Sequence, residues 1–508
     1  MKLVTAEQMR TIEQSCVDRG ITLDRLMQNA GTALAAKAEQ MAGHGTILLL
    51  VGPGNNGGDG LVAAALLAAR GRHVSVYTFK RPDASPFDGY VVRAEDDPDR
   101  LVLRLLAGTS ALIVDALLGI GQSRTVEGEL ATIVSCANTT RGSSTRALAV
   151  DIPTGVEADG GKVLGQAFLA DGTLCMGFVK LGCVLYPGSA YVGSLYLTDA
   201  GIPEELGETV PQSLTDSQTV ATLLPERGYE ANKGSSGRVL AVTGSHDFSG
   251  APVLVSLAAY RAGAGLVELA IPDRIKSSVA SHALEPIFLP LPDVDGKLGP
   301  NGLGKITESF DKASAFVLGS GMGLSESTIQ LVRSLLELLR RPHSPPGVID
   351  ADGLNAVANI PGWHEGLSNV VVTPHPGEMS RLTGLQIQAI QEDRIGVARR
   401  FALQWGVTVV LKGARTVVAS PTGEIAINFS GGPNLATAGT GDVLTGIIGG
   451  LLAQGSAPWD AARCGVFLHG CAGDLWRAQQ GDVGMLASDL LPILAPARQS
   501  ILGEKEAS

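Results

Sequence analysis

The sequence predicts an α/β protein made of two tandem domains, and three observations support this prediction. The chain has 508 residues, which is enough for more than one buried core. In both halves, short β-branched segments alternate with Ala- and Leu-rich helical segments, a pattern typical of βαβ units with mostly parallel sheets. A stretch rich in Pro, Glu, Ser and Thr over residues 201–218 lacks apolar periodicity and is interpreted as the linker. We therefore expect one domain over residues 1–210 and a second over residues 214–503.

Five strands and one helix are predicted in the first half. Each strand is short and mostly followed by Gly, Asp or Pro, as expected where strands end in loops. The strands are Thr46–Val51, Val74–Phe79, Ala111–Val114, Ala147–Val150 and Leu195–Leu197, and the helix is Leu61–Arg70.

A second alternating series follows the linker. Its predicted strands are Val239–Thr243, Leu266–Ala270, Ala315–Gly319, Gly347–Asp350, Val370–Thr373, Val407–Lys412 and Thr416–Ala419. Its predicted helices are Ala251–Ala262, Glu326–Arg340 and Ile390–Gln404, followed by a helical tail at Val443–Ala453 and Ala461–Trp476. The two halves do not resemble each other, so a duplication is not expected.

The composition excludes several classes of function. A hydrophobic fraction of 45% with 18% charged residues excludes extended disorder. The net charge of −11 leaves no basic field for nucleic acid or for an anionic membrane surface. Glycine is abundant, with 65 residues, while aromatic residues make up only 4%. An anionic ligand would therefore have to be held by backbone N–H groups and a few local cations.

The sequence also favours a cytoplasmic location. The chain becomes polar at Thr5 and has no apolar segment typical of a secretory signal. Its longest apolar runs, such as Val443–Ala453, are too short and too rich in glycine to span a bilayer. The six cysteines contain no CxxC pair, and Cys464 and Cys471, one heptad apart on a predicted helix, are interpreted as buried small apolar residues.

A glycine-rich segment, Gly52–Gly60, connects a predicted strand to a predicted helix. Glycines allow the backbone to approach a phosphate or ribose closely, and a helix N-terminus adds free N–H groups and the positive end of a dipole. The segment is neither a Walker loop nor a standard GxGxxG motif. A plain turn is the alternative, but the strand–loop–helix context favours a ligand site.

Two further strand ends of the first half carry acids. Asp115 follows one strand, and Asp151 follows another and precedes Thr154. Because the carboxyl ends of parallel strands converge on one crevice, we expect these residues to share a site with Gly52–Gly60. A helix cap or a turn is the alternative for each Asp taken alone.

In the second half, the strongest signal is the segment Gly439-Thr440-Gly441-Asp442 before a predicted helix. It places backbone donors where a transferring phosphoryl group can sit, and Asp442 beside them can take a proton from an attacking hydroxyl. A capping Asp is the alternative. Lys412–Thr416, which joins two predicted strands, is suited to contact a nucleotide phosphate.

Two other segments of the second half are candidate ligand loops. Gly319–Gly323 follows a predicted strand, and His375 lies between two prolines in a turn, where its role is either structural or ligand-binding. No His or Cys pair is spaced as zinc ligands, and Ser–His–Asp or Cys–His signatures are absent.

Taken together, these motifs resemble the bifunctional NAD(P)H-hydrate repair enzymes, in which an NAD(P)HX epimerase is fused to an ADP- or ATP-dependent NAD(P)H-hydrate dehydratase. The resemblance covers nearly the whole chain. It depends on 55–60, 115–121 and 151–155 in the first half, and on 233–234, 250–252, 350–352, 373–378, 412–416 and 439–442 in the second. It implies two three-layer α/β/α domains, a Rossmann-like epimerase followed by a ribokinase-like dehydratase.

The resemblance also implies roles for individual residues. In the epimerase, Asp151 is the implied acid/base, and Asn56, Asp115 and Thr154 are implied potassium ligands. The implied epimerase contacts to NAD(P)HX are Asn55, Asn56, Gly57, Gly58, Asp59, Gly119, Ile120, Gly121, Gln122, Ser123, Arg124, Thr125 and Asp151. In the dehydratase, Asp442 is the implied catalytic base, the implied hydrate contacts are Ala251, Gly321, His375 and Asp442, and the implied nucleotide contacts are Lys412, Gly413, Ala414, Arg415, Thr416, Gly439, Thr440 and Gly441.

The expected substrates are NADHX, NADPHX and ADP or ATP with Mg²⁺, without nucleic acid or membrane partners. A homo-oligomer is compatible with the sequence. The choices of ADP or ATP, of NADHX or NADPHX, and of an iminium or ring-opened epimerisation remain open. Two other functions are weighed against this one: a ribokinase-like small-molecule kinase, and a first domain that binds dinucleotide without chemistry.

Overall fold

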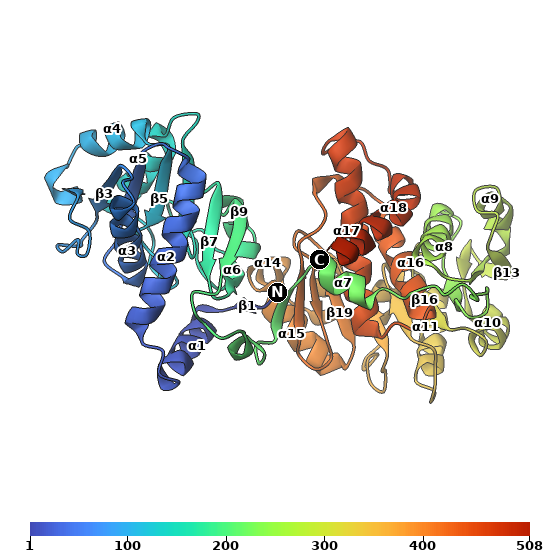
Figure 1. Cartoon of the computed structure of the whole chain (residues 1–508). Coiled ribbons are helices and arrows are strands. Elements are labelled where there is room, and N and C mark those ends of the chain that lie inside the picture. The colour runs from blue at the N-terminus through green and yellow to red at the C-terminus, as the bar shows by residue number, and fades with distance from the viewer. Residues whose placement is uncertain (508) are drawn as a thin grey trace. The chain divides into compact units, whose positions relative to one another are not determined.

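The structure is a computed structural model that describes residues 1–507 (Figure 1). Its contacts divide the chain into two compact units, Lys2–Gln212 and a second that contains Met1 and the chain from Ser213 onwards. Both units contain a mostly parallel sheet with helices, so the predicted α/β class is confirmed. Within residues 1–507, no helix combines the length and the apolar character needed to cross a membrane.

The first unit contains a parallel seven-stranded sheet in the order β4-β3-β2-β5-β6-β7-β9. If β2 is counted as the first strand, the order from β4 to β7 is that of a Rossmann-like open sheet, and β9 is one further strand at the edge. The strands are β2 (Ile47–Val51), β3 (Val74–Thr78), β4 (Tyr90–Arg93), β5 (Leu112–Ala116), β6 (Arg146–Val150), β7 (Gly172–Met176) and β9 (Ser194–Thr198). The helices are α1 (Ala6–Asp18), α2 (Leu23–Ala42), α3 (Asn55–Ala69), α4 (Leu101–Thr109), α5 (Gly128–Thr140) and α6 (Leu181–Val184).

The central strand β2 explains why helices cover both faces of this sheet. All five of its residues are buried. Because successive side chains of a strand point to opposite faces, Ile47, Leu49 and Val51 pack in one cluster with α2 and α3. Leu48 and Leu50 pack in another cluster with α4 and α5. The result is a three-layer α/β/α unit.

A separate two-stranded sheet joins the start of this unit to its later part. Strand β1 (Leu3–Val4) pairs in parallel with β8 (Val179–Lys180). Thr5 then caps α1 by accepting a hydrogen bond from the backbone N–H of Gln8, and the Gln8 side chain accepts one in return from Thr5. This capping box fixes where α1 begins.

The glycine-rich segment differs from its prediction, because α3 begins at Asn55 rather than at Leu61. The glycines of its first turns are required by close packing against neighbouring elements. A Cβ at Gly57 would lie 2.0 Å from the carbonyl oxygen of Gly52, and a Cβ at Gly60 would lie 2.9 Å from Cβ of Ala116. The glycines therefore seat the N-terminus of the helix directly against the ends of β2 and β5.

The second unit is built on a ten-stranded sheet in the order β10-β21-β20-β19-β18-β17-β16-β11-β12-β13. The strands from β19 to β13 are parallel, whereas β19, β20 and β21 pair antiparallel. The strands are β10 (Gln212–Thr215), β11 (Arg238–Val242), β12 (Leu266–Pro272), β13 (Ile287–Leu291), β16 (Ala315–Leu318), β17 (Gly347–Ile349), β18 (Val370–Val372), β19 (Thr408–Leu411), β20 (Val417–Ala419) and β21 (Ile425–Asn428). A short hairpin is formed by β14 (Asp293–Val294) and β15 (Lys297–Leu298).

The second unit also contains helices between and after these strands. They are α7 (Ser217–Leu223), α8 (Gly250–Ala262), α9 (Lys276–Ala280), α10 (Leu303–Phe310), α11 (Glu326–Leu339), α12 (Asp352–Val357), α13 (Pro376–Thr383), α14 (Ile387–Glu392), α15 (Arg394–Trp405), α16 (Thr440–Ala453), α17 (Pro458–Gln480) and α18 (Ala487–Ala507). The predicted helix Ile390–Gln404 was wrong as a single element. Asp393 has an extended φ of −141° between α14 and α15, and its side chain caps α15 by accepting from the N–H of Gly396.

The predicted linker over 201–218 was also wrong in part. It contains a short 3₁₀ helix, Glu204–Gly207, and β10, which is the edge strand of the ten-stranded sheet. Asp216 then caps α7 through a 2.8 Å bond from the N–H of Thr219. The strand gave no alternating apolar pattern because Gln212, Ser213 and Thr215 are polar.

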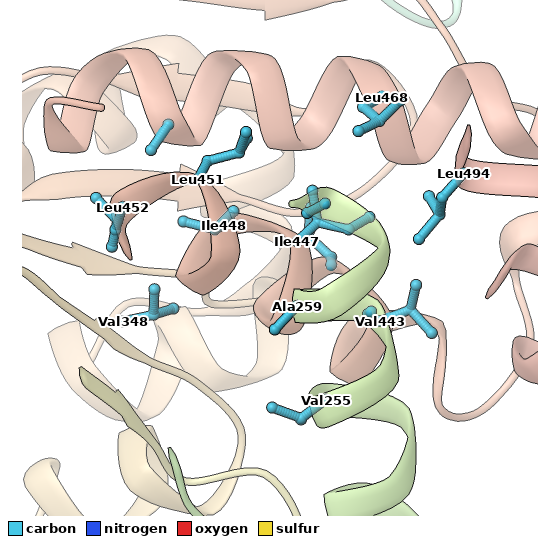
Figure 2. Packing of buried hydrophobic residues seen from close by; sticks show 14 of the residues in the cluster. Val255, Ala259, Val348, Val443, Ile447, Ile448, Leu451, Leu452, Leu468 and Leu494 are labelled. Atoms are coloured by element: carbon cyan, nitrogen blue, oxygen red, sulfur yellow. The ribbon is translucent and has the colours of Figure 1, made fainter. Parts of the chain in front are cut away.

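The core of the second unit is packed around α16, as Figure 2 shows. Val443, Ile447 and Leu451 of α16 lie among side chains of α8, which include Val255 and Ala259. Gly446 permits this close approach, since a Cβ there would lie 2.3 Å from the carbonyl oxygen of Val255. A side chain at this position would have to push the two helices apart.

We expect Gly446→Ala to destabilise the second unit by about 1–3 kcal/mol, the usual cost of overpacking a core. The matched control is Gly304→Ala in α10, where no atom lies within 4 Å of the added Cβ. That change should be neutral or slightly stabilising, because alanine favours a helix over glycine. Urea unfolding of both variants measures the difference, and equal transition midpoints would contradict the packing argument.

Candidate active sites

The first unit contains a cavity of about 790 Å³ at the carboxyl ends of its central strands. Its walls come from the start of α3, the loop after β5, the end of β6 and the helices α1 and α2. Eight of the predicted epimerase contacts line it: Asn55, Asn56, Asp59, Gly119, Ile120, Gly121, Gln122 and Asp151. The other five, Gly57, Gly58, Ser123, Arg124 and Thr125, are not among its lining residues.

Asp151 directly follows β6, and its backbone conformation and contacts hold its side chain in place. Its φ of +67° is unusual for a residue other than glycine. Its carboxylate accepts a 3.0 Å hydrogen bond from the N–H of Met176 and forms an ion pair with Lys180. The Lys180 side chain is fully buried. Burial is the largest single influence and lowers the pKa of Lys180, but the charge and hydrogen bond of Asp151, together with Cys175 and Cys183, raise it by more, so the net shift is upward and the lysine is an ammonium ion.

Asp115, Thr154 and Asn56 form a neighbouring group of polar side chains. The buried Asp115 carboxylate accepts bonds from the N–H of Thr154 at 2.7 Å, from its hydroxyl at 2.8 Å and from the N–H of Leu117 at 3.1 Å. Burial raises the pKa of Asp115 to about 6, although the bonds from Thr154 and Leu117 lower it. The amide of Asn56 donates to the carbonyl oxygens of Leu118 and Val150.

This group has the donors that a monovalent cation needs. Its side chains offer only oxygen as ligand atoms, and no ion pair within residues 1–507 involves Asp115. A buried carboxylate without a cationic partner fits a bound metal ion. Within the same residues, no group of three or more His, Cys, Asp and Glu side chains could hold a metal ion.

Sequence reasoning missed Lys180 and the contribution of α1 to this cavity. The available signal for Lys180 was a single lysine within the apolar run Phe178–Leu181, because a lysine is rarely buried without an anionic partner. For α1, no local signal exists, because its amphipathic pattern is the same whether it covers a core or a ligand site.

The second unit gathers charged residues at the carboxyl edge of its sheet. Asp350 follows β17 and Lys412 follows β19, and the Lys412 Nζ lies 2.7 Å from Oδ1 of Asp350 and 3.7 Å from Oε2 of Glu378. The hydroxyl of Thr445 donates to the other Asp350 oxygen at 2.6 Å. Burial raises the pKa of Asp350, but the charge of Lys412 and the hydrogen bonds from Lys412, Thr445 and Thr373 together outweigh burial, and the net shift is downward. Asp350 and Lys412 therefore form an ion pair in which Asp350 is buried and Lys412 is partly exposed.

Asp442 stands beside this pair on the first turn of α16. Gly439 just before the helix has a φ of +91°, and a Cβ at Gly441 would lie 3.6 Å from Lys412 Nζ and 3.9 Å from Oδ2 of Asp350. Burial, and then the charge of Asp350, raises the pKa of Asp442 to about 6. The structure thus brings together the predicted base, the predicted glycine loop of residues 439–441 and Lys412.

His375 caps a helix and is held in one tautomer. Its Nδ1 accepts from the N–H of Gly377 at 3.0 Å and from that of Glu378 at 3.4 Å, while Glu378 accepts from the N–H of His375. Because Nδ1 is an acceptor, the proton is on Nε2, which lies 3.5 Å from Glu378 Oε1. Burial and the nearby Lys412 lower the pKa of His375, so the ring is a neutral N–H donor.

The remaining predicted dehydratase contacts lie in two places. Gly321, with a φ of +64°, packs on Ala251, because a Cβ at Gly321 would lie 2.7 Å from Cβ of Ala251. The turn after β19 contains Lys412, Gly413, Ala414, Arg415 and Thr416. Arg415 donates to the carbonyl oxygen of Phe429 and lies 3.5 Å above its ring, so its guanidinium is positioned by the protein.

Sequence reasoning did not select Asp350 or Glu378 as site residues. For Asp350, an acid directly after a strand was the same signal that identified Asp115 and Asp151. For Glu378, its role depends on Lys412, which is distant in the sequence, so no local pattern could reveal it.

Comparisons with known proteins cover both units. Residues 23–182 match the family described as YjeF-related protein N-terminus, and residues 239–496 match the family described as NAD(P)H-hydrate dehydratase. The bifunctional NAD(P)H-hydrate repair enzyme of Moorella thermoacetica is 37% identical over 100% of this chain and 98% of its own length.

Two solved structures cover the second unit. An ADP/ATP-dependent NAD(P)H-hydrate dehydratase from Bacillus subtilis, co-crystallized with ATP/Mg²⁺, is 30% identical with a TM-score of 0.49, and covers 57% of this chain and 98% of its own. A hypothetical protein from Streptococcus mutans is 22% identical with a TM-score of 0.50, covers the same share of this chain and 100% of its own, and shares the fold. With the full-length identity to a relative of both activities, the chain belongs to the bifunctional NAD(P)H-hydrate repair enzymes.

Proposed function

We propose that the chain repairs hydrated reduced nicotinamide cofactors with two activities. The first domain, residues 1–210, epimerises R- and S-NAD(P)HX. The second, residues 214–503, uses ADP or ATP to dehydrate S-NAD(P)HX to NAD(P)H, with AMP or ADP and phosphate as products. The observation that carries the proposal is the match of the whole chain to a family with both activities, in a protein with a separate polar site in each unit.

For dehydration, Asp442 takes the proton from the C6 hydroxyl of the hydrate, and the hydroxyl oxygen attacks the terminal phosphorus of the nucleotide. The backbone N–H groups of Gly439–Gly441 steady the charge of the transferring phosphoryl group. Hydroxide is a poor leaving group, whereas phosphate is expelled by the lone pair of the ring nitrogen. Loss of the neighbouring ring proton then restores NADH or NADPH.

The cations around this site fit a nucleotide with its metal ion. The positive charge of Lys412 is already balanced by Asp350. Lys412 therefore positions a phosphate without adding an uncompensated positive charge to the site. Because Mg²⁺ is usually held by one or two carboxylates together with substrate phosphates, Asp350 and Glu378 are the carboxylates that would hold it, which leaves Asp442 free to act as the base. Mg²⁺, when bound, neutralises phosphate charge that develops during transfer.

For epimerisation, Asp151 is the proposed acid/base, held by Lys180 and by the N–H of Met176. Asn56, Asp115 and Thr154 are the proposed potassium ligands, and the uncompensated Asp115 carboxylate supports this. A potassium ion held by these residues would supply a positive charge beside Asp115. The loop of residues 119–122 then contacts the dinucleotide along the cavity wall.

The dehydration rate should fall as the pH falls through about 6. Asp442 accepts a proton only when it is ionised, and burial raises its pKa to about 6. We therefore expect kcat/KM to be constant at neutral pH and to fall roughly tenfold per pH unit below 6. Nucleotide affinity, measured at each pH by calorimetry, separates this effect from binding, and a flat profile down to pH of about 5 would contradict the role of Asp442.

The function is tested with a mixture of both epimers of hydrated NADH, Mg²⁺ and either ADP or ATP. The absorbance of the reduced nicotinamide reports the recovered cofactor. Recovery of the whole pool with one phosphate released per cofactor is the expected result. Recovery that stops once one epimer is spent would refute the epimerase, and a stable phosphorylated product would favour a small-molecule kinase.

A further inference from the structure

The epimerase cavity contains three acids whose chemistry the proposed function does not use: Asp24, which is exposed, and Asp59 and Glu13, which are partly buried. Asp59 lies on the first turns of α3 and Glu13 on α1, and both line the same cavity as Asp151 and Lys180. Two elements that are far apart in the sequence thus bring carboxyl groups to the site of Asp151. Glu13 lies outside the residues that match the family described as YjeF-related.

The charges in this cavity do not balance when every acid is ionised. Lys180 is paired with Asp151, and no ion pair within the described chain involves Asp59 or Glu13. Arg81 donates to the carbonyl oxygens of Gly52 and Gly54, which fixes its guanidinium at the loop rather than at a carboxylate. The charged groups that line the cavity or act on Asp59 are Arg10, Glu13, Asp24, Asp59, Arg81, Asp151 and Lys180.

One of the partly buried carboxyls must therefore keep its proton. Carboxylates that share a site and only one buried cation cannot all ionise without a large electrostatic cost. Asp151 has both Lys180 and a backbone N–H to stabilise its charge, whereas Asp59 has neither. Burial, then the charges of Asp151 and Glu13, raise the pKa of Asp59 to about 8, against Lys180 and Arg81, which lower it.

We propose that Asp59 is a catalytic residue of the epimerase, the general acid that works with Asp151, and that Glu13 is a positioning residue whose negative charge holds the proton on Asp59. This inference deepens the proposed function and rests on it. It gives Asp151 and Asp59 different tasks, because Asp151 forms an ion pair with Lys180 while Asp59 carries a proton.

The step balances with water as the only co-reactant. Asp59 gives its proton to the C6 hydroxyl, the C6–O bond breaks, and the oxygen leaves as water with the bonding pair. The lone pair of the ring nitrogen forms the nitrogen–C6 double bond. A water molecule then adds to C6 from the other face and gives a proton to Asp151. Proton transfer from Asp151 to Asp59 through water restores the starting state.

The first experiment uses the full chain with Asp59→Asn, which keeps the size of the side chain but cannot donate the carboxyl proton. Nucleotide is omitted so that dehydration does not run, and chromatography follows one purified epimer as it equilibrates. We expect the enzymatic rate to fall about 100-fold or more, the usual contribution of a general acid. Dehydration of S-NADHX by the same variant should be unchanged. A rate within twofold of the unmodified chain would overturn the proposal.

The second experiment tests Glu13 by the pH profile. Epimerisation should lose rate as the pH rises through about 8, because Asp59 then loses its proton. Glu13→Gln removes a negative charge that favours the protonated form, so this alkaline limb should move to lower pH. Glu7→Gln, on the same helix but outside the cavity, is the matched control and should leave the limb in place. An unshifted limb in Glu13→Gln would overturn the positioning role.

The two proposals fail in distinguishable ways. If the unmodified chain does not equilibrate the epimers, the proposed epimerase function is wrong. If it does so, and Asp59→Asn does so equally well, only the role of Asp59 is wrong. The pH profile of Glu13→Gln keeps the inference testable even when Asp59→Asn folds poorly.

Discussion

Replacing Asp442 by alanine should lower the rate of nucleotide-dependent dehydration by about three orders of magnitude, within the usual range for loss of a positioned base. The variant should still bind ADP or ATP, because Lys412 and the backbone of Gly439–Gly441 are unchanged. Recovery of NADH from purified S-NADHX measures the rate, and calorimetry measures nucleotide binding. Near-normal turnover would refute the role of Asp442 as the base.

The matched control for this change is Asp460→Ala. Asp460 also occupies the first turn of a helix, α17, but it pairs with Arg463 and does not lie beside Lys412 and Asp350. Asp460→Ala removes the same favourable interaction between a carboxylate and a helix N-terminus, and it leaves the proposed catalytic residues unchanged. Asp460→Ala should therefore keep nearly the full rate, and a comparable loss in both variants would assign the effect of Asp442→Ala to helix capping.

The second large effect is expected from Asp151→Asn. Enzymatic equilibration of the epimers should be lost, while dehydration of S-NADHX continues at the normal rate. Asparagine tolerates the positive φ of Asp151 and keeps its size, so the shape of the cavity is retained. Chromatography of the epimers and the absorbance assay measure the two activities in the same preparation.

This substitution has one structural cost, which can be controlled. It leaves the buried Lys180 without its anionic partner, and breaking a buried ion pair costs about 3–5 kcal/mol. The double change of Asp151→Asn with Lys180→Met removes both charges and should be more stable than the single change, yet equally inactive as an epimerase. Restored epimerisation in the double variant would show that Asp151 has only a structural role.

Much of the fold was predictable from local patterns. Strands next to site residues, such as β2 and β17, are short, apolar and buried on both sides, which gives a continuous apolar run that ends at Gly or Asp. The acids at the carboxyl ends of such strands gave the same signal, although Asp115 is the fourth residue of β5 rather than the residue that follows the strand. Helix starts were less predictable: α3 begins within the glycine-rich segment because its packing partners, not its own residues, favour glycine there.

The remaining site residues depend on contacts between distant segments. Lys180 lies on β8 and pairs with Asp151, which follows β6. Glu378 lies on α13, which follows β18, and pairs with Lys412, which follows the neighbouring strand β19. Arg415 illustrates the reverse case. Its sequence context favoured a phosphate contact, and the structure additionally holds it against Phe429. Such pairings are set by the tertiary fold and leave no periodic signal in either partner.

The pairing of β1 with β8 has a consequence for how the first unit is made. Leu3 pairs with Val179, so β1 cannot pair until a strand near the end of the unit has been synthesised. Closing so long a loop costs entropy and forms slowly compared with local contacts. On the ribosome, this pairing cannot form before Lys180 has emerged, and Lys180 is also the ion-pair partner of Asp151 in the cavity. We therefore expect β1 to reach its native pairing late in the folding of this unit.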